Sequence, residues 1–150
     1  MSTHIRVQTE DFDVNDELEA LAREGTDIGA IASFVGIVRG DDGLTAMRLE
    51  HYPGMTEREI GRHADEARTR WALDGITIIH RSGRLKEGDR IVFVAVACGH
   101  RAAAFEACEF LMDYLKTKAP FWKEEERGSE RDWVDAKSSD DKAAERWRRE

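Results

Sequence analysis

The sequence predicts an α+β fold in which helices pack on a mostly antiparallel sheet. Apolar residues recur at helical spacing over 60–71 and 101–119, whereas the runs at 76–85 and 90–100 are rich in Val and Ile, as strands are. The segment KEGD at 86–89 is typical of a hairpin turn between these two runs, which implies antiparallel pairing. Because helical and strand segments are mixed along the chain, we expect both to form one layered structure.

The part of the chain before Pro53 is expected to supply three strands and one helix. In chain order these elements are a strand at 4–8, a helix from about Val14 to Arg23 that Gly25 closes, a strand at 28–40, a turn at 41–43 and a strand at 44–52. The strand at 28–40 is apolar on both faces and rich in Val and Ile. We therefore expect it to be buried.

The rest of the chain is expected to begin and end with helices. In chain order it contains a helix at 54–71 with a capping box from Thr56 to Glu59, strands at 76–85 and 90–100, a long helix at 101–119 that Pro120 ends, and a short helix in the charged tail at about 137–150 with Ser139 as N-cap. Ile60, Ala64, Ala67 and Trp71 give the first helix one apolar face. Cys108 lies on the apolar stripe of the long helix and is expected in the core.

Composition and charge exclude several function classes. The chain has 150 residues, 41% of them apolar, and a formal net charge of -8, so we expect one globular domain without the broad cationic surface that nucleic acids require. It shows no membrane-spanning run and no secretory signal, and its two cysteines cannot make a disulfide framework, which fits a reducing cytoplasm. We expect no metal site, because neither the two cysteines nor His63, His80 and His100 show metal-binding spacing.

Three lysines surround an apolar turn at the end of the long helix. Lys116 and Lys118 fall in its last turn, where a cation already stabilises the helix dipole, and Lys123 follows Pro120 and an aromatic pair. Because the proline turns the chain, we expect Lys123 to fold back toward Lys116. Two ammonium groups held close and partly dried favour acid–base or nucleophilic chemistry. A solvated helix end and simple core packing of the aromatic pair are the alternatives.

Two other places combine the end of a strand with a cation. Gly99 separates a strand from the helix that begins near His100 and Arg101, so free backbone N–H groups and two side-chain donors meet there. Arg39 ends the strand at 28–40. At Gly99 the residues alone favour an ordinary helix start with two surface cations, whereas the charge of Arg39 either ends in water or reaches a pocket at the edge of the sheet. The residues alone therefore support an anion-binding α+β domain, with lysine-based chemistry as one option.

Three blocks of sequence give the chain a family resemblance. They are LEHYPGM at 49–55, IIHRSGRLKEGDRIVFVAVACGHRAAAFEACEFLMDYLKTKAPFWKEE at 78–125, and WVDA at 133–136. The chain resembles the large, catalytic subunit of molybdopterin synthase over nearly its whole length. The resemblance implies an α/β hammerhead fold and a homodimer that binds two copies of a small ubiquitin-like subunit, which makes a heterotetramer.

The resemblance also implies a reaction. The small subunit carries a thiocarboxylate on its glycine-terminated tail, and its sulfur passes to cyclic pyranopterin monophosphate. Two transfers make the dithiolene of molybdopterin. No metal or organic cofactor is expected, because the sulfur arrives already activated.

The resemblance assigns the residues of the site as well. Lys116 and Lys123 match the two essential lysines of the family, and Arg39 matches its pocket arginine. The remaining matches in the substrate pocket are the pair His100 and Arg101, the acidic Glu124 and Glu125, and, through the backbone, Val38 and Ile37, the latter standing where some relatives have lysine.

The spacing of two site residues predicts a shared active site. Arg101 and Lys116 are fifteen residues apart on one predicted helix, which separates them by ~22 Å. A pterin phosphate is too small to touch both easily. If both line one site, they come from different chains, and the site straddles the dimer interface.

Two other functions stay open on the sequence alone. A binding module without chemistry would hold a ubiquitin-like tail or a phosphate ligand, and Lys116→Ala would weaken only its binding. A lysine Schiff-base enzyme acting on a phosphorylated carbonyl compound would be trapped by borohydride.

Overall fold

The computed structural model describes residues 2–134 and 138–148, except for the side chains of 138–140. Its elements are β1 (Ser2–Gln8), α1 (Val14–Ala22), β2 (Ala30–Ile37), β3 (Ala46–His51), α2 (Met55–Arg70), β4 (Leu73–Arg81), β5 (Gly83–Lys86), β6 (Arg90–Cys98), α3 (Arg101–Thr117), β7 (Phe121–Arg127), β8 (Glu130–Val134) and α4 (Ser138–Glu145). The N-cap predicted at Ser139 lies outside the described side chains.

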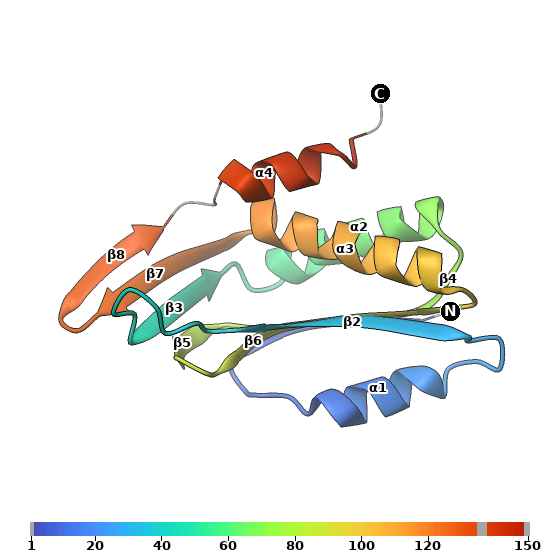
Figure 1. Cartoon of the computed structure of the whole chain (residues 1–150), viewed down its shortest axis with the longest axis horizontal. Helices are drawn as coiled ribbons and strands as arrows, with labels where there is room; N and C mark the ends of the chain where they lie inside the picture. Colours follow the sequence, from blue (N-terminus) through green and yellow to red (C-terminus); the bar gives the residue numbers. More distant parts are fainter. Residues whose placement is uncertain (1, 135–137, 149–150) are drawn as a thin grey trace.

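The strands form two sheets of four. In the first sheet the order is β1-β4-β6-β2, with β1 parallel to β4 and the other pairs antiparallel. In the second sheet the order is β5-β3-β7-β8, and every pair is antiparallel. Figure 1 shows α1 on one face of the first sheet and α2 and α3 on the other, with α4 beyond α3. The predicted α+β class with mostly antiparallel pairing is confirmed.

Strand β6 lies at the centre of the core because helices cover both of its faces. Val92, Val94 and Val96 pack with residues of α2 and α3, whereas Phe93 and Ala95 pack with residues of α1. Successive side chains of a strand point to opposite faces, so a strand covered on both sides needs apolar residues throughout. This explains why the predicted run at 90–100 shows no polar alternation.

The predicted faces of the two long helices are confirmed. Ile60, Ala64 and Ala67 of α2 are buried, and so is Cys108 of α3. Helix α3 ends at Thr117, shortly before the proline. Among the helices of residues 2–134 and 138–148, none has the length and apolar character that crossing a membrane requires.

Strand β2 differs from the expectation that the segment at 28–40 is buried. It pairs only with β6 and forms the edge of the first sheet. The side chains of Phe34 and Ile37 are 41% and 56% exposed. The strand is apolar as predicted, but within the described residues of one copy no other strand pairs with its outer edge. An apolar edge of this kind is a surface that another chain can cover.

The predicted strand at 76–85 is two strands that belong to different sheets. Strand β4 ends at Arg81 and β5 begins at Gly83, whose φ of 84° is open to glycine without strain. The turn after β5 is closed by the N–H of Asp89, which donates to the carbonyl of Lys86 at 3.0 Å. The antiparallel pairing of β4 with β6 is confirmed, whereas β5 pairs with β3.

The hairpin of β7 and β8 was not among the predicted elements. The sequence of β7 is FWKEEER. Its run of charged residues leaves no alternating apolar pattern from which a strand could be predicted. Its turn contains Gly128 with a φ of 63°. Strand β7 is held by pairing with β3 on one side and β8 on the other. Both site lysines predicted from the sequence flank the start of this strand, so its position decides the geometry of the site.

The N-terminus of α2 differs from the predicted capping box. Its N-cap is Gly54, whose backbone N–H donates to the carboxylate of Glu57 at 3.1 Å. The box from Thr56 to Glu59 is therefore wrong, because Thr56 lies one residue inside the helix. A helix can begin at a glycine because glycine tolerates the φ of 85° that the chain adopts at this turn.

Thr56 instead holds the turn that precedes β7. Its side chain is fully buried, and its hydroxyl donates to the carbonyl of Pro120 at 3.1 Å. The same hydroxyl accepts the N–H of Tyr52 at 3.0 Å. One side chain thus ties the start of α2 to the turn between α3 and β7.

Thr56→Val should lower the free energy of unfolding by about 1–3 kcal/mol, because it removes two hydrogen bonds made by a fully buried hydroxyl to partly buried backbone groups. Urea unfolding measures the change. The control is Thr69→Val, which alters an exposed threonine of the same helix and should shift stability by no more than about 0.5 kcal/mol. Equal stability of the two variants would contradict the assigned role of Thr56.

Candidate active site

The two predicted lysines stand on either side of the turn at Pro120. Lys116 lies in the last turn of α3 and is exposed. Lys123 lies on β7, half-buried, opposite Leu49 of β3. Because side chains alternate along a strand, Lys123 points to the same face of the second sheet as Phe121. The chain therefore turns after α3 and places the second lysine on a paired strand.

A buried histidine lies against Phe121. The rings of His80 and Phe121 are stacked, with centroids 3.8 Å apart and planes at 20°. His51 lies opposite Phe121 on β3, and its ring centroid is 6.2 Å from that of Phe121. Burial lowers the pKa of His80 to about 4, and the nearby charges of Lys116 and His51 act in the same direction. The ammonium of Lys116 is thus within electrostatic range of this stack.

Burial of a neutral His80 should make stability depend on pH. Its pKa falls from 6.5 to about 4 on folding, so the unfolded chain binds the proton first as the pH drops. The contribution is complete above pH 6.5 and is lost as the pH falls from 6.5 toward 4, at a cost of about 3 kcal/mol. Urea unfolding at several pH values across this range measures the slope.

The comparison variant for this slope is His80→Phe, which keeps a ring but cannot titrate. Its stability should fall less steeply between pH 6.5 and 4 than that of the unmodified chain. Some slope should persist, since burial also lowers the pKa of His63. If the free energy of unfolding changes equally with pH in the two proteins, the attribution of this pH dependence to His80 is refuted.

The segment after β2 carries the predicted arginine. Arg39 is exposed and its Nε lies 3.0 Å from a carboxylate oxygen of Asp41. Ile37 is exposed, whereas the side chain of Val38 is buried in a cluster that also contains Leu49. The N–H of Val38 donates to Asp89 and its carbonyl accepts from Gly88. The buried side chain and the backbone hydrogen bonds of Val38 thus hold the segment in place, whereas the side chain of Arg39 extends into solvent.

The predicted His-Arg pair lies at the far end of α3. His100 is the N-cap of the helix, Arg101 is its first residue, and both are exposed. The helix runs unbroken to Thr117, so Arg101 and Lys116 are ~22 Å apart along its axis. One copy of the chain therefore carries Lys116 and Lys123 on either side of the turn at Pro120, at the opposite end of α3 from the His-Arg pair.

The two predicted acidic residues point to opposite faces of β7. Glu124 lies opposite Arg48 of β3 and is half-buried. Glu125 shares the face of Lys123, and its carboxylate lies 3.2 Å from a guanidinium nitrogen of Arg127. Of the two, only Glu125 is oriented toward the same side as the lysine.

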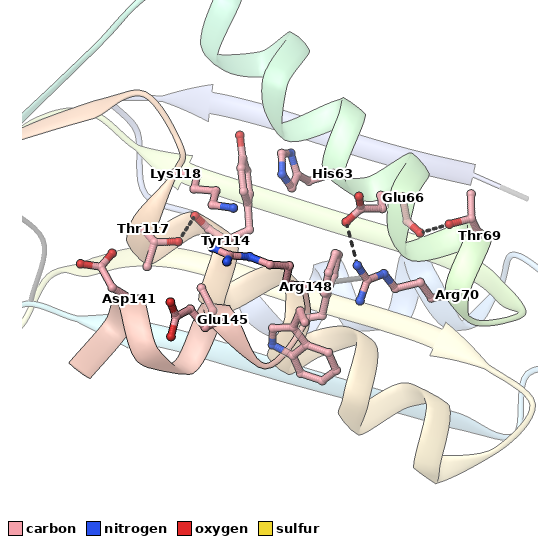
Figure 2. A pocket seen from close by; sticks show the side chains of 13 residues that line it. His63, Glu66, Thr69, Arg70, Tyr114, Thr117, Lys118, Asp141, Glu145 and Arg148 are labelled. Atoms are coloured by element: carbon pink, nitrogen blue, oxygen red, sulfur yellow. Dashed lines mark hydrogen bonds and ion pairs between the residues drawn. The ribbon is translucent and has the colours of Figure 1, made fainter. Parts of the chain in front are cut away.

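A cavity of about 490 Å³ lies on another side of α3 (Figure 2). It is formed by α2, the second half of α3 and the C-terminal segment, and its lining includes His63, Arg70, Tyr114, Lys118 and Trp147. Lys118 lines this cavity, whereas Lys116 and Lys123 do not. Within the part of the chain that the structure describes, no group of His, Cys, Asp or Glu side chains is arranged to hold a metal ion.

Two residues beside the predicted site were given no functional role on the sequence alone. They are His80, whose ring stacks on Phe121, and Thr56, whose hydroxyl donates to the carbonyl of Pro120. A weak signal existed for His80, because it stands in the otherwise apolar strand ITIIHR. Nothing local distinguishes Thr56 from a capping residue.

The chain was compared with known families and proteins. The family model described as MoaE protein matches residues 7–118. The molybdopterin synthase catalytic subunit of Mesorhizobium japonicum (strain LMG 29417) is 55% identical over 147 residues, which cover 96% of this chain and 92% of that protein.

Solved structures agree with this similarity. The structure of a molybdopterin biosynthesis MoaE protein from Burkholderia ambifaria MC40-6 superimposes with a TM-score of 0.84 and 53% identity, and covers 97% of each chain. A chain from the complex of subunits 1 and 2 of molybdopterin-converting factor from Helicobacter pylori 26695 has a TM-score of 0.72 and 22% identity, over 88% of this chain and 89% of that one, and shares the fold. The family match and the identity over nearly the whole length lead to one conclusion: the chain belongs to the MoaE family of molybdopterin synthase catalytic subunits.

Proposed function

We propose that this chain is the catalytic subunit of a molybdopterin synthase and converts cyclic pyranopterin monophosphate into molybdopterin. The sulfur comes from the thiocarboxylated C-terminus of a small ubiquitin-like subunit. Two transfers to the substrate build the dithiolene. Family membership supports the reaction class, and the chemistry of the site supports the way it is carried out.

The observation that supports this proposal is the turn at Pro120: before it, α3 carries Lys116, whose charge acts on His80, and after it, β7 carries Lys123 on the same face as Phe121. Both reactants are anions, since the substrate carries a cyclic phosphate and the tail of the small subunit carries a thiocarboxylate. The chain as a whole has a formal charge of -8, so a local group of cations is what would draw anions to this place. Holding the two reactants together lowers the entropic cost of their reaction.

Each cation of the site has a separate role in this proposal. Lys116 contacts the thiocarboxylate and stabilises the charge that develops as sulfur is transferred. Lys123 moves a proton to or from the substrate, or stabilises charge on it. The substrate is held by Arg39, His100 and Arg101 on its phosphate and pterin, by the backbone at Ile37 and Val38, and by Glu124 and Glu125.

One copy of the chain cannot gather all of these groups, because α3 separates Arg101 from Lys116 by ~22 Å. We therefore place two copies together as a homodimer, with each site built from both. The uncovered edge strand β2 supports this arrangement. Phe34 and Ile37 on it, and Phe105 on the first turns of α3, are 41%, 56% and 65% exposed. A partner over this apolar edge would approach the end of α3 that carries His100 and Arg101.

The assembly and its location complete the proposal. Two small subunits join the homodimer to make a heterotetramer, each delivering its tail to one site. The complex acts in the cytoplasm, where the two buried cysteines, Cys98 and Cys108, stay free thiols.

The decisive test mixes the chain with a thiocarboxylated small subunit and cyclic pyranopterin monophosphate. Mass spectrometry should detect the dithiolene product, and the small subunit should return to its carboxylate form. Binding of both reactants without product would show instead a module that only binds. Borohydride trapping of a lysine adduct with the substrate would show Schiff-base chemistry and overturn the sulfur-transfer mechanism.

A further inference from the structure

The stack of His80 on Phe121 connects the two sheets. His80 belongs to β4 in the first sheet, and Phe121 belongs to β7 in the second. Lys116 is carried by α3, which packs on β6 and β2 of the first sheet, whereas Lys123 is carried by β7. The distance between the two lysines therefore depends on how the sheets are held where the rings meet.

The histidine is fixed in one orientation and one protonation state. Its side chain is buried, with 8% of the residue exposed, and its Nδ1 lies 2.9 Å from the carbonyl oxygen of Arg81. A carbonyl can only accept a hydrogen bond, so Nδ1 carries a proton; in the neutral ring that burial favours, Nε2 is then left as an acceptor. The hydrogen bond and the stacked ring together define the plane of the imidazole.

The surroundings favour an uncharged ring at this position. Lys116 of α3 and His51 of β3 both act on His80, and Phe121 of β7 covers its face. A protonated His80 would put a further positive charge into a buried place beside a lysine. When the ring of His80 is neutral, the positive charge of this region is carried by the lysines.

We infer that His80 is a positioning residue, whose ring contact with Phe121 sets where Lys123 stands relative to Lys116. This role rests on the proposed function, since it concerns the alignment of the same two lysines. Misplacement of a reacting group by about 1 Å can cost up to 10²-fold in rate, so loss of the contact should appear in kcat. Substrate binding relies on other cations as well and should change much less.

The test compares two replacements of His80 in the complete complex with thiocarboxylated small subunit. His80→Leu removes the ring and should lower kcat about 10- to 100-fold, with KM for the pyranopterin changed no more than about threefold. His80→Phe keeps an aromatic ring against Phe121 and should recover most of the lost kcat. Recovery by the aromatic variant, together with the separation of kcat from KM, is a pattern that a general loss of stability does not produce.

A replacement on the other side of the contact gives an independent measurement. Phe121→Leu removes the partner ring from a half-buried position and should lower kcat by a similar factor. Combining it with His80→Leu should add little, because both changes remove the same interaction. If His80→Leu does not fold, Phe121→Leu and His80→Phe still decide the question.

His63→Leu is the matched control. His63 also stacks on an aromatic ring, with its centroid 3.3 Å from that of Tyr114, but it lines the cavity on the other side of α3 (Figure 2). Its replacement should leave kcat within about twofold, as expected for a ring outside the site.

Two results would overturn the inference. One is a normal kcat for both His80→Leu and Phe121→Leu, and the other is a failure of His80→Phe to recover activity while the protein stays folded. The proposed function fails separately, when the unmodified chain makes no dithiolene or when Lys116→Ala makes as much as the unmodified chain. The two failures are thus distinguished in one assay.

Discussion

Lys116→Ala should lower kcat for molybdopterin formation by about 10²- to 10³-fold, the cost of removing one group that stabilises developing charge in an acyl-transfer site. The side chain is exposed on the last turn of α3, so its loss should leave the fold intact. Binding of the small subunit should weaken less than the rate, because its tail is one part of a larger interface. Single-turnover formation of the dithiolene, followed by mass spectrometry, measures the rate.

The control for this experiment is Lys118→Ala. Lys118 is exposed, stands two residues further along and faces the cavity beside α2 (Figure 2). Its replacement removes the same charge from the same end of the helix, so general electrostatic attraction falls equally in both variants. We expect activity within about threefold of the unmodified chain. Equal losses in the two variants would mean that only the overall charge of this region matters, and would exclude a specific role for Lys116.

Mixing Arg101→Ala with Lys116→Ala should restore activity that neither variant has alone. If each site takes Arg101 from one copy and Lys116 from the other, a mixed dimer contains one intact site and one site with both defects. Random exchange makes about half of the dimers mixed, so about a quarter of the normal activity should return. The measurement is dithiolene formation after the two variants have exchanged subunits, with exchange verified by native mass spectrometry.

The matched control mixes Lys116→Ala with Lys123→Ala. In the proposed site both lysines come from the same chain, on either side of the turn at Pro120, so every site of a mixed dimer lacks one of them. No activity should return. Absence of recovery in the first mixture, despite proven exchange, would show that Arg101 and Lys116 do not meet across the interface. Recovery in both mixtures would show that the two lysines serve different sites.

Local patterns in the sequence were enough for the helices and the central strands. The apolar faces of α2 and α3 arise from residues three and four positions apart, and the proline after α3 marks its end. The run at 90–100 predicts a strand because β6 is covered on both faces. In each case the information lies within one or two turns of helix or a few strand residues.

The same patterns failed where a partner distant in sequence decides the outcome. Strand β7 is mostly charged and exists through its pairing with β3, whose residues stand about 70 to 80 positions earlier in the chain. Strand β2 is apolar like a buried strand but stands at an edge in a single copy. Thr56 has the spacing of a capping residue but bonds to Pro120 instead. Propensity and spacing describe neighbours in the chain and not such contacts.

By itself, the sequence determined the two long helices, the apolar core strands and the presence of Lys116 and Lys123 around a proline turn, because these depend on residues close together in the chain. Only the tertiary structure decided that His80 of β4 stacks on Phe121 of β7, and that β2 stands at the edge of its sheet. The reason is physical: a ring stack between residues 80 and 121 forms only after two sheets have been placed together. Whether a strand stands at an edge likewise depends on which other strands pair with it, and not on its own residues.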